Sequence, residues 1–195
     1  MTSPRERAHA LRGNWIDEVV RIDTAVYAAI AATPTPTLDR AFRRLSGAAD
    51  HSKLWLGSSA LLAVAGGARG RSAALNGIVS IAVTSAIVNG LLKPLGGRRR
   101  PERATHRVPV ERHVKMPRTR SFPSGHAASA AAYATGVAMA FPEIGVGLTF
   151  AAGLVAYSRV HTGVHYPIDV IAGSLTGAAA APAAVAGLNR RTRRS

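Results

Sequence analysis

SRVHTGVHYPID, residues 158–169, interrupts two runs of sequence built mostly of alanine, glycine and valine. Its twelve residues hold one arginine, two histidines and one aspartate, whereas the flanking chain carries little charge. Charged groups are costly to bury among apolar helices unless they pair or hydrogen-bond. The pattern therefore predicts an apolar helical bundle that carries a polar site on one face.

Five predominantly apolar segments support a helical bundle. A helix that crosses a bilayer needs about 20 residues, which only the second and the fifth segments clearly reach. A soluble, alanine-rich bundle is the alternative. We favour membrane spans because the segments follow one another with polar breaks, and because small residues such as GSLTG suit close helix packing. The segments are Leu54–Ala68, Ala73–Leu92, Ala127–Phe141, Ile144–Tyr157 and Ile168–Leu188, with GSLTG at Gly173–Gly177.

The N-terminal region is amphipathic. Apolar residues recur at helical spacing over 14–32, with charged residues off that stripe, which predicts an interfacial helix or a helix packed on the bundle. The break TPTPT follows at 33–37, and 38–45 fits another short helix. No apolar core precedes a small-residue cleavage site, so we expect this region to remain in the mature protein. The stripe consists of Trp15, Val19, Ile22, Val26 and Ile30.

These patterns predict an all-α, integral membrane bundle of about five to six helices. We expect N-terminal interfacial helices over 1–50, a transmembrane domain over 51–189 and a basic tail over 190–195.

The charge is strongly basic and unevenly distributed. The chain of 195 residues has a formal net charge of +15, which alone would suit a nucleic-acid binder or a protein on anionic lipid. Lysine and arginine gather near the N-terminus, over 93–120 and in the tail, which is typical of basic loops between membrane helices. We expect a bilayer and no nucleic acid as partner. Cysteine is absent, so any metal would need histidine and carboxylate ligands.

The order of the spans brings two polar stretches together. If 73–92 crosses the membrane, the basic stretch 93–122 emerges on one side. The next segment crosses away, the chain turns at Pro142 and Glu143, and 144–157 returns. Residues 158–169 then lie on the same face as 93–122.

The side chains on that face suit a phosphoryl group. Phosphoryl transfer spreads negative charge over three oxygens, which guanidinium and ammonium groups can bind. A glycine at a helix start leaves backbone amides free for an anion. Pro167 fits the first turn of a helix, which lets Asp169 hold one nitrogen of His165 while the other attacks phosphorus. The further candidates are the cations Lys93, Arg100 and Arg159, the pair Ser124 and Gly125, and the acid His126.

Three motifs occur in an order that resembles the type 2 phosphatidic acid phosphatase (PAP2) superfamily. The signature K-x6-RP starts at Lys93, PSGH covers 123–126, and SR-x5-H-x3-D covers 158–169. The resemblance implies that His165 forms a phosphohistidine, that Asp169 orients it, and that His126 acts as acid and then base. It also implies that no metal or cofactor is needed. Its implied phosphate ligands are Lys93, Arg100, Ser124, the Gly125 amide and Arg159.

For residues outside the motifs, the sequence predicts less specific roles. We expect His161 to be structural and Tyr166 to pack at the membrane interface. Seven further arginines favour a solvated basic loop that touches anionic headgroups, with contacts to a second phosphate as the alternative. They are Arg98, Arg99, Arg103, Arg107, Arg112, Arg118 and Arg120.

The predicted function is hydrolysis of a lipid phosphate by a multi-pass protein of the plasma membrane. The leading candidates for the substrate are polyprenyl-linked, such as decaprenylphosphoryl-5-phosphoribose or an undecaprenyl or decaprenyl diphosphate. Phosphatidylglycerophosphate and phosphatidic acid remain alternatives, as do the soluble acid phosphatases and vanadium haloperoxidases of the superfamily, and a basic binding protein without catalysis. Arg69, Arg71 and the tail lie opposite the site, so the positive-inside rule favours an extracytoplasmic active site.

Overall fold

The computed structural model describes residues 4–194, with side chains from Trp15 onward. It is all-α over these residues, as predicted, with no strand among them. Three short turns of other helix type are η1 (Asp50–Ser52), η2 (Val88–Leu92) and η3 (Val110–Arg112). The helices are α1 (Pro4–Ala32), α2 (Pro36–Ala48), α3 (Lys53–Ala65), α4 (Gly67–Ile87), α5 (Lys93–Leu95), α6 (Gly125–Ala138), α7 (Pro142–His161) and α8 (Pro167–Thr192).

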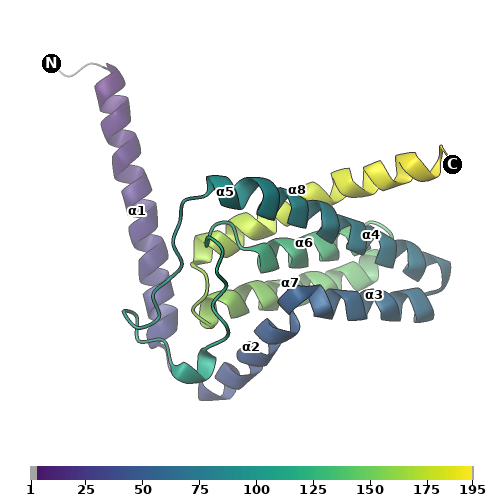
Figure 1. The fold of residues 1–195 in the computed structure, drawn as a ribbon, viewed down its shortest axis with the longest axis horizontal. Helices are drawn as coiled ribbons and strands as arrows, with labels where there is room; N and C mark the ends of the chain where they lie inside the picture. Colours follow the sequence, from purple (N-terminus) through teal and green to yellow (C-terminus); the bar gives the residue numbers. More distant parts are fainter. Residues whose placement is uncertain (1–3, 195) are drawn as a thin grey trace.

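The bundle consists of α3, α4, α6, α7 and α8, which lie roughly alongside one another (Figure 1). Each of the five predicted apolar segments corresponds to one of these helices, with η2 and α5 prolonging α4. Segment 54–68 runs past the end of α3 into α4, and segment 127–141 runs past the end of α6. The central helix is α6, which packs against α4, α7 and α8. The long loop from α5 to α6 and the short loop from α7 to α8 meet at one end, as predicted, because Arg100 Nη1 donates to Val164 O at 2.8 Å.

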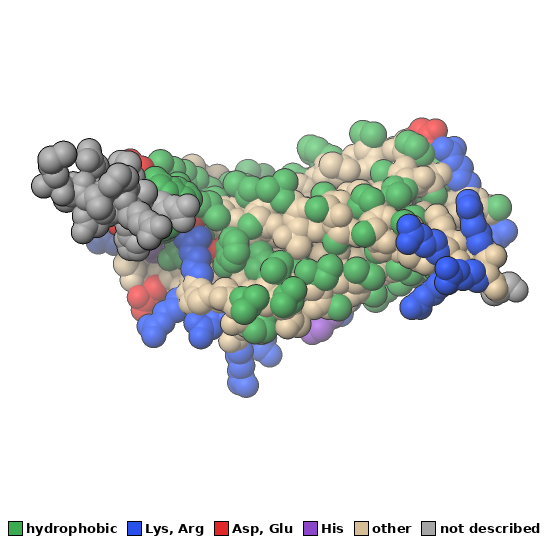
Figure 2. Space-filling model, turned by 90° about the horizontal axis from the view of Figure 1, so that it is seen from above, with side chains coloured by type: hydrophobic (Ala, Val, Ile, Leu, Met, Phe, Trp, Pro, Cys, Tyr) green, Lys and Arg blue, Asp and Glu red, His purple; other side chains and the backbone are tan. Residues whose placement is uncertain are grey.

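Two helices are long and apolar enough to cross a membrane. They are Gly67–Leu95 and Pro167–Thr192, the same two segments that the sequence singled out. At about 1.5 Å per residue, α8 is roughly 39 Å long, which exceeds a hydrocarbon core of about 30 Å. Hydrophobic side chains spread over the middle of the molecule, and lysine and arginine side chains gather toward its two ends (Figure 2). The apolar belt therefore lies between two basic ends, as in a membrane-spanning bundle.

Small residues let α8 approach α6 closely. A Cβ at Gly177 would overlap the carbonyl oxygen of Ala128, and a Cβ at Gly173 would overlap that of Ser124. The close approach predicted from GSLTG is thus confirmed. It matters for the site because Ser124 belongs to the loop that starts α6.

Helix α1 lies across the end of the bundle that carries these loops, nearly at right angles to the other helices (Figure 1). Its inner face buries Asp23 and Tyr27 against the protein. Four of the five residues of its apolar stripe face outward, with Trp15 57% exposed and Ile22 56% exposed, whereas Ile30 packs against the core. A helix across the bundle axis with an outward apolar face is suited to the membrane interface, while its inner face packs on the bundle.

The basic loop is tied to the N-terminal helices by a buried ion pair. Arg112 is fully buried, and its Nε donates to Asp39 Oδ1 at 2.8 Å. Its other nitrogens donate to the carbonyls of Ile30 (3.0 Å) and Thr33 (2.6 Å) at the end of α1. His161 Nε2 lies 2.9 Å from the same carboxylate oxygen, in agreement with a structural role. These contacts hold α1 and α2 against the loop over the site.

Hydrogen bonding keeps the carboxylate of Asp39 charged. Burial raises the pKa of Asp39, but hydrogen bonds from Thr35, His161 and Arg112 outweigh burial and hold that pKa below its usual value. The ionised carboxylate is thus available to neutralise Arg112.

The close helix packing gives a testable prediction. Gly177→Ala should destabilise the protein by about 1–3 kcal/mol because α8 must move away from α6. Gly187→Ala is the matched control on the same helix, since nothing lies within 4 Å of a Cβ there. Thermal unfolding in detergent measures both variants. Equal unfolding temperatures for the two would contradict the close approach.

Candidate active site

The loop that carries His165 is fixed by a regular helix ending. Helix α7 gives way to Gly163, whose φ of 70° suits a residue without a side chain. The amides of Gly163 and Val164 donate back to the carbonyls of Val160 (2.9 Å) and Arg159 (3.1 Å), the pattern that closes many helix C-termini. His165 follows directly and is 1% exposed, so the turn delivers it into the protein interior.

The two ring nitrogens of His165 have different partners. Arg100 Nη1 lies 3.2 Å from Nε2. Nδ1 lies 3.5 Å from Asp169 Oδ2 and 3.4 Å from Ser121 Oγ. Because a guanidinium can only donate, Nε2 must be the acceptor and Nδ1 must carry the proton. The lone pair of Nε2 therefore faces the cation, and Nδ1–H faces the carboxylate.

Asp169 is held by donors on several sides. It is fully buried in the first turn of α8, which Pro167 begins. Its Oδ2 accepts from Ser121 Oγ and from the amide of Tyr166 at 2.9 Å, and its Oδ1 accepts from Arg98 Nη1 at 3.2 Å. These contacts fix the carboxylate beside the Nδ1 side of the imidazole.

Burial keeps His165 neutral. The pKa of His165 is lowered to about 4, because burial and the nearby guanidinium groups of Arg100 and Arg159 together outweigh Asp169, whose hydrogen bond and charge raise it. At neutral pH the imidazole is thus uncharged, which a nucleophilic nitrogen requires.

The cations of the first motif are linked to each other. Arg100 Nε donates to Thr119 O at 2.8 Å, and its Nη2 donates to Thr119 Oγ1 at 3.2 Å. Lys93 Nζ donates to the same hydroxyl at 3.3 Å. Thr119 thereby holds Lys93 and Arg100 on one side of His165.

The PSGH segment forms the start of α6. Ser124 is its N-cap, with Oγ 3.5 Å from the amide of Ala127, and its own amide donates to Asp169 O at 2.9 Å. Ser124 is fully buried. A Cβ at Gly125 would lie 3.4 Å from Lys93 Nζ, so this glycine keeps the space beside the amine open. The free amides at the start of α6 therefore adjoin the cations.

His126 and Arg159 share a partner from the N-terminal region. His126 Nε2 lies 2.8 Å from Asp50 Oδ1, and Arg159 Nη1 lies 3.7 Å from the same oxygen. Arg159 is 1% exposed and donates to the hydroxyl and the carbonyl of Ser46. Its Nε is buried without a partner. Among the described side chains, no hydrogen bond joins His126 to His165. The two histidines therefore lie at the same end of the bundle without a direct hydrogen bond.

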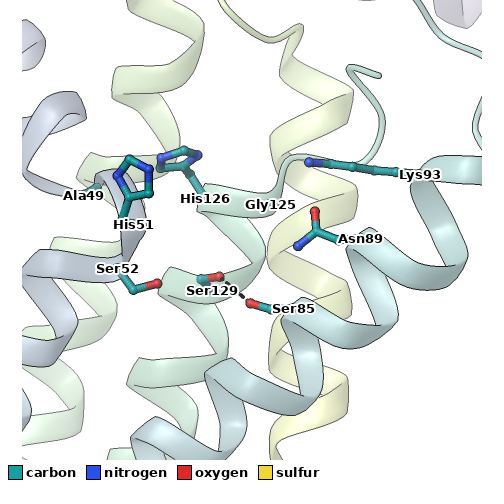
Figure 3. Close-up of a pocket in the computed structure, with 9 residues that line it drawn as sticks. All are labelled: Ala49, His51, Ser52, Ser85, Asn89, Lys93, Gly125, His126 and Ser129. Atoms are coloured by element: carbon teal, nitrogen blue, oxygen red, sulfur yellow. Dashed lines mark hydrogen bonds between the residues drawn. The ribbon is translucent and has the colours of Figure 1, made fainter. Parts of the chain in front are cut away.

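A cavity of about 230 Å³ opens beside His126 and Gly125. Figure 3 shows Lys93 and Asn89 reaching toward Gly125 from one side, with His51 and Ser52 on the other. Ser85 and Ser129, 3.5 Å apart, also line the cavity. Hydroxyl, amide and imidazole groups thus dominate the lining, which consists of Ala49, His51, Ser52, Ser85, Asn89, Lys93, Gly125, His126 and Ser129.

Three of the seven further arginines are not solvated, contrary to expectation. Besides Arg112, Arg98 forms ion pairs with Asp23 and Asp169, and the half-buried Arg103 donates to Val114 O at 3.0 Å. The physical reason is that carboxylates of the folded chain pair with Arg98 and Arg112, and that a backbone carbonyl accepts a hydrogen bond from Arg103. The exposed ones are Arg99, Arg107, Arg118 and Arg120.

Sequence reasoning missed several residues that hold the site. Ser121 and Thr119 stand close before PSGH, and only that proximity could have suggested them. Ser46 and Asp50 carry no local signal. Tyr166, expected at the membrane interface, packs against Tyr27 of α1 with the two ring centroids 5.2 Å apart, and the guanidinium of Arg98 lies over its ring. Tyr166 thus connects α1 with the site. Among the described side chains, no group of three or more His, Asp or Glu could hold a metal ion.

Comparison with known proteins identifies the family. Residues 73–193 match the sequence model of the PAP2 superfamily. Because this match covers more than half of the chain, the chain belongs to the PAP2 superfamily.

Two curated relatives match over shorter stretches. The chain is 36% identical over 101 residues to a lipid A 1-phosphatase of Rhizobium johnstonii, covering 49% of this chain and 40% of that protein. It is 44% identical over 61 residues to an undecaprenyl-diphosphatase of Sulfolobus acidocaldarius, covering 29% and 28%. The match thus spans less than half the length of these relatives.

Two crystal structures share the fold. LpxE of Aquifex aeolicus is similar with a TM-score of 0.68 at 24% identity, over 83% of this chain and 93% of that one. A transmembrane PAP2-type phosphatidylglycerolphosphate phosphatase of Bacillus subtilis is similar with a TM-score of 0.67 at 23% identity, over 89% and 87%. Both comparisons support a transmembrane PAP2 fold.

The protonation of His165 is directly testable. With its pKa lowered to about 4, the ring should stay neutral as pH falls until about pH 4, with the proton on Nδ1. Long-range proton–nitrogen NMR of histidine-labelled protein in detergent reports both, with His165→Gln to assign the signal. A proton on Nε2, or a midpoint near 6.5, would contradict the geometry.

Proposed function

We propose that this member of the PAP2 superfamily hydrolyses a phosphate monoester or diphosphate of a lipid through a phosphohistidine. One observation carries the proposal: a neutral, buried His165 presents Nε2 to Arg100 while Asp169 lies beside Nδ1. An imidazole held in this way can act as a nucleophile, because the carboxylate of Asp169 is already placed to stabilise the positive charge that the ring gains.

In the first step, Nε2 of His165 attacks phosphorus and the bond from phosphorus to the leaving oxygen breaks. His126 gives a proton to that oxygen. Lys93, Arg100 and Arg159 bind the phosphoryl oxygens, where charge-assisted hydrogen bonds stabilise the developing negative charge. Arg159 suits this role because its buried Nε has no other partner.

The start of α6 adds uncharged donors. The amide of Gly125 and the hydroxyl hydrogen of Ser124 contribute to the phosphate site, together with the positive end of the helix dipole. Because Gly125 has no side chain, the phosphate can approach Lys93.

In the second step, a water molecule gives a proton to His126, its oxygen attacks phosphorus and the bond from phosphorus to Nε2 breaks. The phosphorylated ring carries a positive charge while Nδ1 keeps its proton. The buried carboxylate of Asp169 stabilises that charge between the two steps.

We propose that turnover needs no metal ion. Lys93, Arg100 and Arg159 supply the positive charge that bound divalent cations provide in two-metal phosphatases.

We further propose that the protein lies in the plasma membrane with the site on the extracytoplasmic side. Arg69 donates to Ala140 O and pairs with Glu143 at 3.0 Å, at the end of the bundle away from the site. The basic tail of α8 lies at that same far end (Figure 1). The positive-inside rule then makes the far end cytoplasmic.

For the substrate we propose a polyprenyl-linked phosphate. The similarity to an undecaprenyl-diphosphatase supports this class. The polar cavity beside His126 favours a leaving group that carries hydroxyls, as in decaprenylphosphoryl-5-phosphoribose, over an undecaprenyl or decaprenyl diphosphate. Phosphatidylglycerophosphate, which also has a hydroxylated leaving group, is the second candidate, and phosphatidic acid follows it.

The test is phosphate release by detergent-purified protein in excess EDTA, over a panel of these lipids and water-soluble esters. His165→Ala should lower release by about 10³-fold or more, because the nucleophile is lost. His113→Gln, which changes a histidine bonded to Val108 O outside the site, should leave the rate unchanged.

One lipid class should dominate the rates. Release that needs added metal would overturn the metal-free chemistry. No release above the His165→Ala level on any member would contradict the catalytic proposal and favour a basic binding protein instead.

A further inference from the structure

The partner of His126 comes from outside the motifs. Asp50 opens η1, between α2 and α3, and precedes residues 73–193 that match the family. Its Oδ1 lies 2.8 Å from His126 Nε2. An ionised carboxylate only accepts hydrogen bonds, so Nε2 carries a proton in this pair and Nδ1 is left for other chemistry.

Asp50 is also next to a phosphate-binding cation. The same Oδ1 lies 3.7 Å from Arg159 Nη1, which Ser46 holds from the end of α2. The side chain of Asp50 is 39% exposed and that of His126 is 23% exposed, so both reach the open part of the site. One carboxylate thus lies between the candidate acid and a ligand of the phosphate.

The turn that carries Asp50 is anchored and unusual. Ala49 before it and Trp55 after it are buried in the core. His51 and Ser52 both adopt left-handed backbone, with φ of 55° and 58°. Residues with a side chain rarely adopt this conformation, and it is found where neighbouring structure enforces it, often at functional sites. Ala49 and His51 flank the cavity in Figure 3.

We propose that Asp50 is the positioning residue for His126 in the reaction described above, and the inference rests on that proposed function. Asp50 keeps Nε2 protonated throughout and stabilises the imidazolium. Nδ1 takes up a proton from solvent as the phosphate anion binds, which makes the ring an imidazolium, and gives that proton to the leaving oxygen as the first phosphorus–oxygen bond breaks. In the second step Nδ1 takes a proton from the attacking water, while Asp50 stays ionised.

The role predicts a defect that depends on the leaving group. An alkoxide needs a proton as it departs, whereas 4-nitrophenolate leaves without one. With full-length protein in detergent, Asp50→Asn and Asp50→Ala should lower kcat/KM on an alkyl phosphate about 10- to 100-fold, since kcat/KM reports formation of the phosphohistidine and not its hydrolysis. On 4-nitrophenyl phosphate the loss of kcat/KM should stay below about threefold. Asp17→Asn, on an exposed aspartate of α1, is the matched control.

A double-mutant cycle separates positioning from a structural effect. In a His126→Asn background, Asp50→Asn should cause no further loss, because Asp50 acts through His126. Equal losses on both esters, or a further loss in that background, would overturn the proposal. A lower KM in Asp50→Asn would also overturn it, since Asp50 would then be competing with phosphate for Arg159.

A second readout does not depend on turnover. Histidine NMR should find neutral His126 with its proton on Nε2 in the wild type and in Asp50→Glu, and a mixture of tautomers in Asp50→Ala. A wild type inactive on every substrate but with this NMR result would defeat the proposed function and leave the pairing intact. A neutral ring with its proton on Nδ1 in the wild type would overturn the positioning role itself.

Discussion

The buried carboxylate of Asp169 is the constraint on which the rest of the site depends. It accepts from the hydroxyl of Ser121, the amide of Tyr166 and the guanidinium of Arg98, and it faces Nδ1 of His165. Removing one partner of a buried ion pair typically costs about 3–5 kcal/mol. Satisfying this one group therefore fixes the basic loop, the PSGH loop and the start of α8 against each other.

The same principle recurs in the N-terminal region, where three aspartates each neutralise a group of the site end. Asp23 pairs with Arg98, Asp39 with Arg112, and Asp50 with Arg159. A chain with a net charge of +15 repels itself where its cations gather. These carboxylates relieve that repulsion and, at the same time, place α1 and α2 over the site. The outward apolar face of α1 is suited to the membrane interface.

Local pattern predicted much of the fold. The apolar segments gave the helices of the bundle, GSLTG gave the close contact of α8 with α6, and the order of spans gave the end where the loops meet. The motifs identified the candidates His165, its neighbour Asp169 and the cation Arg100, because these residues stand a few positions apart or at a recognisable spacing. Such features depend on residues a few positions apart or on a fixed order along the chain.

The contacts that sequence reasoning missed are all long-range. The pairs Asp23–Arg98, Asp39–Arg112 and Asp50–His126 are separated by 75, 73 and 76 positions. Each aspartate stands in a polar helix or turn where a solvated carboxylate is equally compatible with the local sequence. The prediction that the further arginines are solvated was partly wrong for the same reason. Composition does not show which guanidinium groups acquire buried partners when the chain folds.

The central claim is that Nε2 of His165 becomes covalently phosphorylated in a site that uses fixed cations in place of metal. The most direct measurement mixes the detergent-purified protein, in excess EDTA, with a radiolabelled lipid phosphate that it hydrolyses, and stops the reaction within milliseconds. We expect label on the peptide that contains His165, decaying as free phosphate appears and absent in His165→Gln. Free phosphate formed at the full rate without any labelled protein, or label that persists in His165→Gln, would contradict it.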